Sequence, residues 1–163
     1  MQLMVETLIN AAPERVFGVL LDVESWPRRI AQIEQIDVIG GGPVAVGTRF
    51  RETRIMHGQR ETIEMTIVEI VPPERLVTTA QAHGSEYRMQ HVVSGDASRT
   101  RLVLTFQARA STLRARLMTP LVYVFHPLLK RQLRRDLEAL KESIERDTSA
   151  HAEPSTSPHA RLP

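Results

Sequence analysis

The chain contains no cysteine among its 163 residues. This absence excludes disulfide scaffolds, thiolate metal sites and cysteine nucleophiles. Aromatic residues make up only 4% of the chain, and the formal net charge is only +2. A nucleic-acid-binding surface normally combines clustered basic residues with aromatic side chains for base stacking. The composition therefore gives no case for a nucleic-acid partner.

Long hydrophobic runs and cofactor motifs are also missing. The longest apolar stretch, residues 117–129, is interrupted by Pro120 and Pro127 and is shorter than the ~20 residues that a bilayer-spanning helix needs. Residues 1–12 lack an early basic residue, so they make a poor signal peptide. No histidine pair has the spacing of a helical zinc motif, and the glycine-rich residues 40–43 lack the residues that complete a phosphate loop. We therefore expect a cytoplasmic protein with no metal and no cofactor.

Strand-like and helix-like patterns follow one another in a simple order. Residues 2–10 are rich in the β-branched and aliphatic residues of a strand. Pro13 is typical of a helix start, and Pro27 should redirect the chain into a second short helix or turn. From there on, apolar residues alternate with polar ones between glycine- and proline-containing turns, which predicts an antiparallel meander of six further strands. We expect these strands at residues 33–39, 47–57, 59–71, 75–83, 86–93 and 100–110.

A long amphipathic pattern follows the last strand. It predicts a helix whose apolar stripe covers one face of the sheet. The composition changes after Asp147, so we expect one domain over residues 1–147 and a disordered tail over residues 148–163. The predicted fold is α+β: a curved seven-stranded antiparallel sheet around a long C-terminal helix, with two short helices after the first strand. The stripe consists of Leu113, Leu117, Leu121, Val124, Leu128, Leu133, Leu137, Leu140 and Ile144.

Several of these segments resemble the START-like helix-grip superfamily (SRPBCC), in particular its polyketide cyclase/dehydrase and lipid-transport branch. The resemblance implies a cavity between the sheet and the C-terminal helix that holds a small hydrophobic ligand, such as a lipid, a fatty acyl chain, an isoprenoid or a polyketide. Members of the superfamily range from lipid carriers to cyclases, hydrolases and regulatory partners, so the fold does not settle the chemistry. The segments that carry the resemblance are residues 9–17, 22–27, 47–52, 69–76 and 133–141.

Two charged residues lie in phase with an apolar one in the strand expected at residues 47–57. If Phe50 points inward, so do Glu52 and Arg54, because alternate residues of a strand share a face. Buried charge is costly unless it is paired or used. Arg54 could then hold a ligand carboxylate or polarise a ligand carbonyl. The alternative is a strand near the sheet edge with both charges in water.

A histidine and a tyrosine share the apolar face of another strand. Tyr87 and His91 could act as acid and base on an enolisable substrate, although a single histidine on an apolar face is more often a hydrogen-bonded core residue. We expect Glu52 and His91 as the catalytic candidates. The predicted ligand-binding residues are Phe50, Glu52, Arg54, Tyr87, Met89, His91, Leu104, Phe106, Leu117, Leu121 and Phe125.

Three functions are compatible with this sequence. A binding module for a small apolar ligand is the first expectation, and a cyclase/dehydratase-like enzyme that uses the same cavity is the alternative. The third is an interaction protein whose cavity has collapsed. Basic residues also flank the apolar part of the long helix, either as a solvated face or for transient contact with an anionic membrane. These basic residues are Arg114, Arg116, Lys130, Arg131, Arg134 and Arg135.

Overall fold

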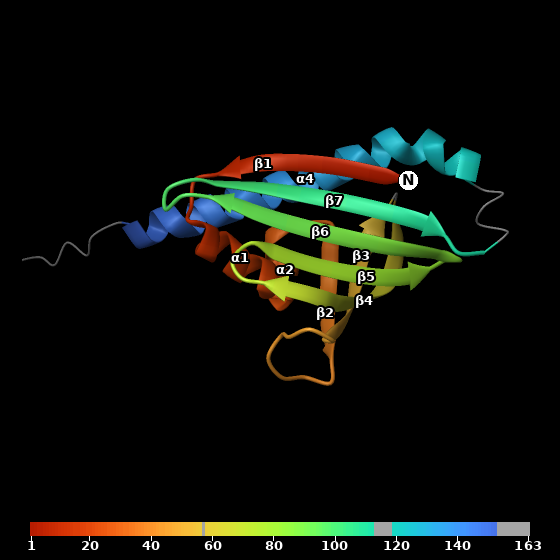
Figure 1. Cartoon of the computed structure of the whole chain (residues 1–163), viewed down its shortest axis with the longest axis horizontal. Helices are drawn as coiled ribbons and strands as arrows, with labels where there is room; N and C mark the ends of the chain where they lie inside the picture. The colour runs from red at the N-terminus through yellow and green to blue at the C-terminus, as the bar shows by residue number, and fades with distance from the viewer. Residues whose placement is uncertain (57, 113–118, 153–163) are drawn as a thin grey trace, which may run out of the picture.

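The computed structural model describes residues 1–56, 58–112 and 119–152, and it shows a curved sheet with one long helix lying behind it (Figure 1). The seven strands lie close to the ranges expected from the sequence, and the predicted fold class is confirmed. The strands are β1 (Gln2–Ile9), β2 (Ile33–Ile39), β3 (Arg49–Met56), β4 (Gln59–Val71), β5 (Arg75–Ala82), β6 (Ser85–Gly95) and β7 (Thr100–Ala110).

The strands form one sheet in the order β1-β7-β6-β5-β4-β3-β2, and every neighbouring pair is antiparallel. Strands β2 to β7 follow one another as the predicted meander, whereas β1 pairs with β7. The tight link between β5 and β6 consists of His83 and Gly84, both with positive φ (51° and 72°). This backbone conformation suits the twist of a two-residue hairpin.

Two short helices connect β1 to β2. They are α1 (Pro13–Leu21) and α2 (Trp26–Arg29), separated by the 3-10 turn η1 (Val23–Ser25). Pro13 occupies the first turn of α1, where a missing backbone N–H leaves no intrahelical hydrogen bond unmade. The side chains that α1 buries are Val16, Phe17 and Leu20, so this helix contributes to the core.

The long helix α4 (Thr119–Ala152) covers the inner face of the sheet and closes the core. Its buried stripe packs with the inward residues of the strands. A hydrogen bond from Thr7 Oγ1 to Glu138 Oε1 (2.8 Å) also joins β1 to α4. The stripe residues buried in the described part of α4 are Leu133, Leu137, Leu140 and Ile144.

Helix α4 continues beyond the domain boundary that the sequence predicted at residue 147. The hydroxyl of Thr148 donates to the carbonyl of Ile144 (2.8 Å), and the helix ends at Ala152. Residues 148–152 are therefore helical, and the hydroxyl of Ser149 likewise donates to the carbonyl four residues earlier, that of Glu145, at 3.0 Å. The rest of the expected tail, residues 153–163, lies outside the described residues.

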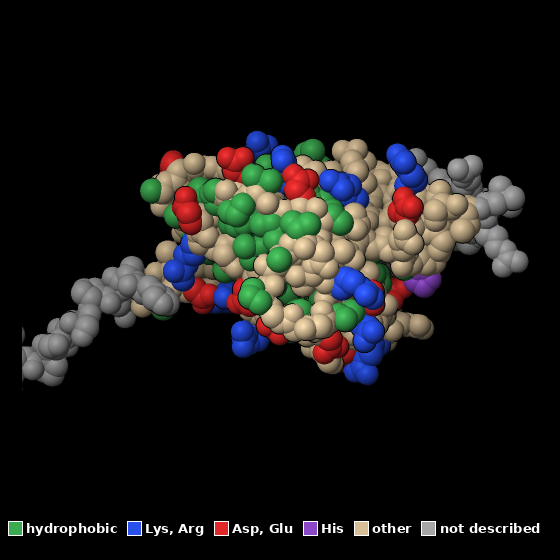
Figure 2. Space-filling view, turned by 60° about the horizontal axis from the view of Figure 1, so that its bottom comes forward, with side chains coloured by type: hydrophobic (Ala, Val, Ile, Leu, Met, Phe, Trp, Pro, Cys, Tyr) green, Lys and Arg blue, Asp and Glu red, His purple; other side chains and the backbone are tan. Residues whose placement is uncertain are grey.

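The surface combines charges of both signs with limited apolar area. In Figure 2 acidic and basic side chains are interspersed, and hydrophobic side chains gather in one area in the left half of the view. On the exposed side of α4, the basic residues Lys130, Arg131, Arg134 and Arg135 face water. None of the helices in the described residues is long and apolar enough to cross a bilayer.

Candidate functional site

A buried cluster of two carboxyl groups and one guanidinium joins β3 to α4. Arg54 Nε donates to Glu52 Oε1 at 2.5 Å, and Arg54 Nη1 donates to Asp136 Oδ2 at 3.0 Å. Glu52 is 3% exposed and Asp136 is 6% exposed. Burying ions costs several kcal/mol each unless pairing and hydrogen bonds compensate. The ion pairs and hydrogen bonds among these three side chains therefore hold the cluster together.

The regular register of β3 points this cluster toward α4. Phe50 lies opposite Met65 and Glu52 opposite Ile63, with no register shift along the β3–β4 pair. Since alternate residues share a face, Arg54 follows Phe50 and Glu52 to the inner side. The structure thus places the predicted pair inside, not in water at the sheet edge.

Asp136 comes from the apolar stripe of α4 and was not predicted from the sequence. It lies three residues after Leu133 and one before Leu137, so helical spacing turns it toward the sheet. A carboxylate in a row of leucines is the signal that would have identified it. Its Oδ1 atom is buried and has no hydrogen-bond partner among the described residues.

Burial controls the protonation of this cluster. It raises the pKa of both Glu52 and Asp136 above their ordinary values, and the attraction of Arg54 only partly opposes this rise. One guanidinium cannot neutralise two carboxylates in a dry interior. The two buried acids therefore hold a proton more readily than carboxyl groups in water do.

His91 supplies a neutral base close to these groups. It lies on the inner face of β6, is 8% exposed, and burial lowers its pKa to about 4. Its Nδ1 atom has no hydrogen-bond partner among the described residues, and its ring lies 6.5 Å from that of Trp26. A neutral imidazole with a free nitrogen can accept a proton from a bound molecule.

Two adjoining cavities meet at the polar cluster. The inner cavity, of about 50 Å³, is lined by Glu52, Arg54, His91, Asp136 and Trp26 together with aliphatic side chains. It has room for a water molecule or two, or for one carbonyl group. The outer cavity, of about 280 Å³, also reaches Glu52 and Arg54, and most of its wall is apolar.

The outer cavity extends away from the cluster toward the β3–β4 and β5–β6 hairpins. Tyr87 and Phe106 stack on each other in its wall, with ring centroids 5.8 Å apart. Near the hairpins, Glu61 Oε1 and His83 Nε2 are 2.8 Å apart and line the same space. This arrangement suits an elongated molecule with one polar end at Arg54.

Most of the predicted binding residues that the structure describes lie in these walls. Glu52, Arg54, Tyr87, Met89, His91, Leu104 and Phe106 line one or both cavities. Phe50 does not: it is fully buried and packs edge-on against Trp26, with ring centroids 6.0 Å apart. Trp26, which packs on Phe50, lines the inner cavity instead. Leu117, and the side chains of Leu121 and Phe125, lie outside the described part of the structure.

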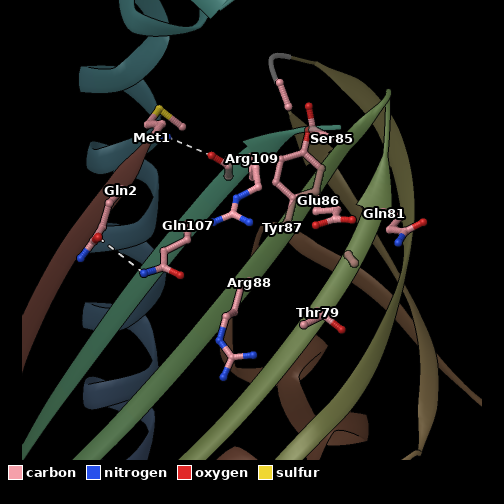
Figure 3. A pocket seen from close by; sticks show the side chains of 13 residues that line it. Met1, Gln2, Thr79, Gln81, Ser85, Glu86, Tyr87, Arg88, Gln107 and Arg109 are labelled. Carbon is pink, nitrogen blue, oxygen red and sulfur yellow. Dashed lines mark hydrogen bonds between the residues drawn. The ribbon is translucent and has the colours of Figure 1, made fainter. Parts of the chain in front are cut away.

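A larger and more open groove lies over β5, β6 and β7. Its volume is about 910 Å³, and Figure 3 shows its side chains. The charged groups in it, Glu86, Arg88 and Arg109, come from outward positions and are exposed. None of these three is buried, whereas the charged groups of the inner cavity lie on the opposite face of the sheet, where Glu52 and Asp136 are buried around Arg54. Among the described residues, no cluster of three or more histidine, aspartate and glutamate side chains could hold a metal.

Comparison with known proteins connects this geometry to one family. A profile of the family described as "Polyketide cyclase / dehydrase and lipid transport" matches residues 1–145. A search of curated proteins found no match.

Solved structures with the same fold include enzymes. The Zhui aromatase/cyclase from Streptomyces sp. R1128 is 20% identical, with a TM-score of 0.75 over 94% of this chain and 99% of that chain. A START superfamily protein from Mycobacterium smegmatis is 13% identical, with a TM-score of 0.67 over 93% and 99% of the two chains. Norcoclaurine synthase from Thalictrum flavum, in complex with dopamine and hydroxybenzaldehyde, is 13% identical, with a TM-score of 0.64 over 94% and 89%.

Proposed function

The chain belongs to the polyketide cyclase / dehydrase and lipid transport family, and from this membership and the geometry of its cavities we propose that it binds a small hydrophobic molecule that carries an oxygen function. The observation that carries the proposal is a mostly apolar cavity of about 280 Å³ that ends at the Glu52–Arg54–Asp136 cluster. The apolar walls contribute most of the affinity, at ~25 cal/mol per Å² of buried apolar surface. The cluster orients the oxygen atom.

A substitution that fills the cavity tests this proposal. Ala80 lies on the inner face of β5, opposite Met65 and Tyr87, and lines the outer cavity. We expect Ala80→Phe to weaken the binding of an aryl ketone such as acetonaphthone by at least about tenfold, a loss of ~1.4 kcal/mol. Isothermal titration calorimetry measures the affinity, and circular dichroism shows whether the overpacked variant is folded.

The neighbouring residue provides a matched control. Gln81 follows Ala80 on the same strand but is exposed on the outer face. Gln81→Phe adds the same ring outside the cavity, so its affinity for the ketone should equal that of the wild type. A folded Ala80→Phe variant that binds as tightly as Gln81→Phe would rule out this cavity as the binding site.

A second candidate function is acid–base catalysis on the bound molecule, as in a cyclase or dehydratase. The observation that favours it is the neutral His91 in the same inner cavity as Arg54 and Asp136. In this reaction His91 removes a proton from the carbon next to a carbonyl group, while Arg54 stabilises the charge that develops on that oxygen. The resulting enolate carbon attacks a second carbonyl of the same molecule, whose oxygen takes a proton, and water then leaves.

The first step of that chemistry can be measured alone. We expect the wild-type protein to accelerate hydrogen–deuterium exchange at the central carbon of an aryl β-diketone, observed by NMR. His91→Phe should reduce this acceleration by ~100-fold, the contribution of a positioned general base, while the affinity for the diketone persists. Equal acceleration by the two proteins would show that His91 is not the base, and no acceleration by the wild type would leave ligand binding without catalysis.

A further inference from the structure

The two cavities are lined by more acidic side chains than arginines and lysines. The acidic side chains that line them are Glu52, Asp136 and Glu61, whereas Arg54 is the one arginine or lysine among the described lining residues. Three other groups there can carry positive charge: His91, His83 and the terminal ammonium group of Met1. Burial keeps His91 neutral, and His83 pairs with Glu61. The ammonium group donates to the carbonyl of Ala108 at 2.9 Å, beside Tyr87 near the β5–β6 hairpin rather than at Arg54.

The guanidinium of Arg54 is already shared between two carboxyl groups. Its Nε atom is taken by Glu52 and its Nη1 atom by Asp136, and its side chain is only 16% exposed. A ligand carboxylate at this point would therefore be the third acid around one cation. In a buried site, like charges at hydrogen-bonding distance cannot all stay ionised without a large cost.

The atoms that remain free in the inner cavity suit a neutral oxygen. Among the residues that the structure describes, neither Asp136 Oδ1 nor His91 Nδ1 has a hydrogen-bond partner, and both residues line this space. The free Asp136 oxygen can accept from an amide or hydroxyl group, and a neutral imidazole nitrogen accepts from a hydroxyl or donates to a ketone oxygen, according to its tautomer. These groups offer no uncompensated positive charge to an anion.

We propose that Glu52 is the residue that determines ligand head-group specificity: by occupying Arg54, it makes the site accept neutral ketones, amides and hydroxyls and reject carboxylates. The inference rests on the proposed binding function and narrows it, since it excludes free fatty acids and other carboxylates from the apolar ligands that the cavity accepts. Arg54 could hold a ligand carboxylate or polarise a ligand carbonyl, and the inference supports the second role.

Two ligands of the same shape and different charge test the inference. Naphthalene carboxamide and naphthalene carboxylate should differ in affinity for the wild-type protein by at least about tenfold in favour of the amide, measured by isothermal titration calorimetry near neutral pH. Glu52→Gln keeps the shape of the side chain and an acceptor for Arg54 but removes its negative charge. We expect the amide-to-carboxylate affinity ratio to fall by at least about tenfold in this variant.

A second acid on the same cavity wall provides the control. Glu61 faces the outer cavity but has its hydrogen bond with His83. Glu61→Gln should leave the affinity ratio as in the wild type. Asp136→Asn, which removes the negative charge of the other partner of Arg54, should shift the ratio in the same direction as Glu52→Gln and provides a second variant if Glu52→Gln does not fold.

The possible results separate this inference from the function on which it rests. If neither naphthalene compound binds the wild-type protein, the proposed binding function is wrong. If both bind the wild type equally well, or if Glu52→Gln and Asp136→Asn leave the ratio unchanged, the protein binds apolar molecules but Glu52 does not select their head group.

Discussion

Replacing Arg54 with methionine is expected to lower the free energy of unfolding by about 3–5 kcal/mol near neutral pH. Methionine retains the length and the apolar stem of the side chain, so little packing is lost. What is lost is the one cation between Glu52 and Asp136, which are 3% and 6% exposed. Two buried carboxyl groups then face each other without compensation. Urea unfolding followed by circular dichroism measures the change.

The stability lost in Arg54→Met should depend on pH, because Glu52 and Asp136 take up protons as the pH falls. Burial already raises the pKa of Glu52 and Asp136 in the native protein, and removal of Arg54 raises both further. Groups with a raised folded-state pKa bind protons more tightly in the native than in the unfolded protein. Their stabilising contribution is thus complete below the unfolded-state pKa of ~4 and is lost as pH rises through the folded-state value. The loss of unfolding free energy caused by Arg54→Met should therefore be smaller at about pH 5 than at about pH 7.

An exposed arginine on the same strand provides the control for this prediction. Arg49 donates to Glu64, and the two side chains are 54% and 38% exposed. Surface ion pairs of this kind contribute ~0–1 kcal/mol, so Arg49→Met should change stability little at either pH. A deficit of Arg54→Met that is the same at both pH values would show that packing, not charge, holds the cluster together.

The sequence was sufficient to predict the sheet and the helix that covers it. The period-two alternation from Ile33 onward and the turn residues between strands correspond to local physical constraints, which act within a few residues. The apolar stripe of α4 has the same local origin. These patterns therefore predicted the antiparallel meander of β2 to β7, whereas the pairing of β1 with β7 joins distant parts of the chain and followed from no local pattern.

The composition of the site could be predicted only in part. Phe50, with Met56 at the end of the strand, was the main indication of which face of β3 is buried, because both faces of this strand carry charged residues. The neighbouring β2–β3 pair does contain a register shift, between Ile33 and Gln35, and a similar irregularity in β3 would have turned Glu52 outward. Strand phase follows from pairing along the whole strand, which these two apolar residues cannot establish.

Asp136 and Trp26 were missed because they enter the site from distant parts of the chain. Arg54 and Asp136 are separated by 82 positions, and no local pattern joins them. Trp26, the first residue of α2, packs on both Phe50 and His91 and lines the inner cavity, whereas the predicted lining residues included Phe50 and not Trp26. A polar residue on an apolar helical stripe is the feature that would have identified Asp136.

Acid is expected to destabilise the protein through His91. The pKa of this buried imidazole is lowered from 6.5 to about 4, because desolvation disfavours its charged form. A base with a lowered folded-state pKa contributes stability above its unfolded-state pKa and loses it as pH falls to the folded-state value. Between these two values the loss amounts to about 3 kcal/mol. His91→Phe removes the group that must be charged, so its stability should fall less on acidification.

The two carboxyl groups of the cluster oppose the effect of His91 on stability in acid. Glu52 and Asp136 have raised pKa values and stabilise the native protein on acidification, and they remain present in His91→Phe. The variant should therefore lose less stability than the wild type between about pH 7 and about pH 4.5, measured by urea unfolding at both. His83→Phe removes an imidazole that is 72% exposed on the same sheet and should keep the wild-type difference. If His91→Phe loses as much stability in acid as His83→Phe, then His91 is not the group whose protonation limits stability, and the neutral base assigned to the cavity would have to be sought elsewhere.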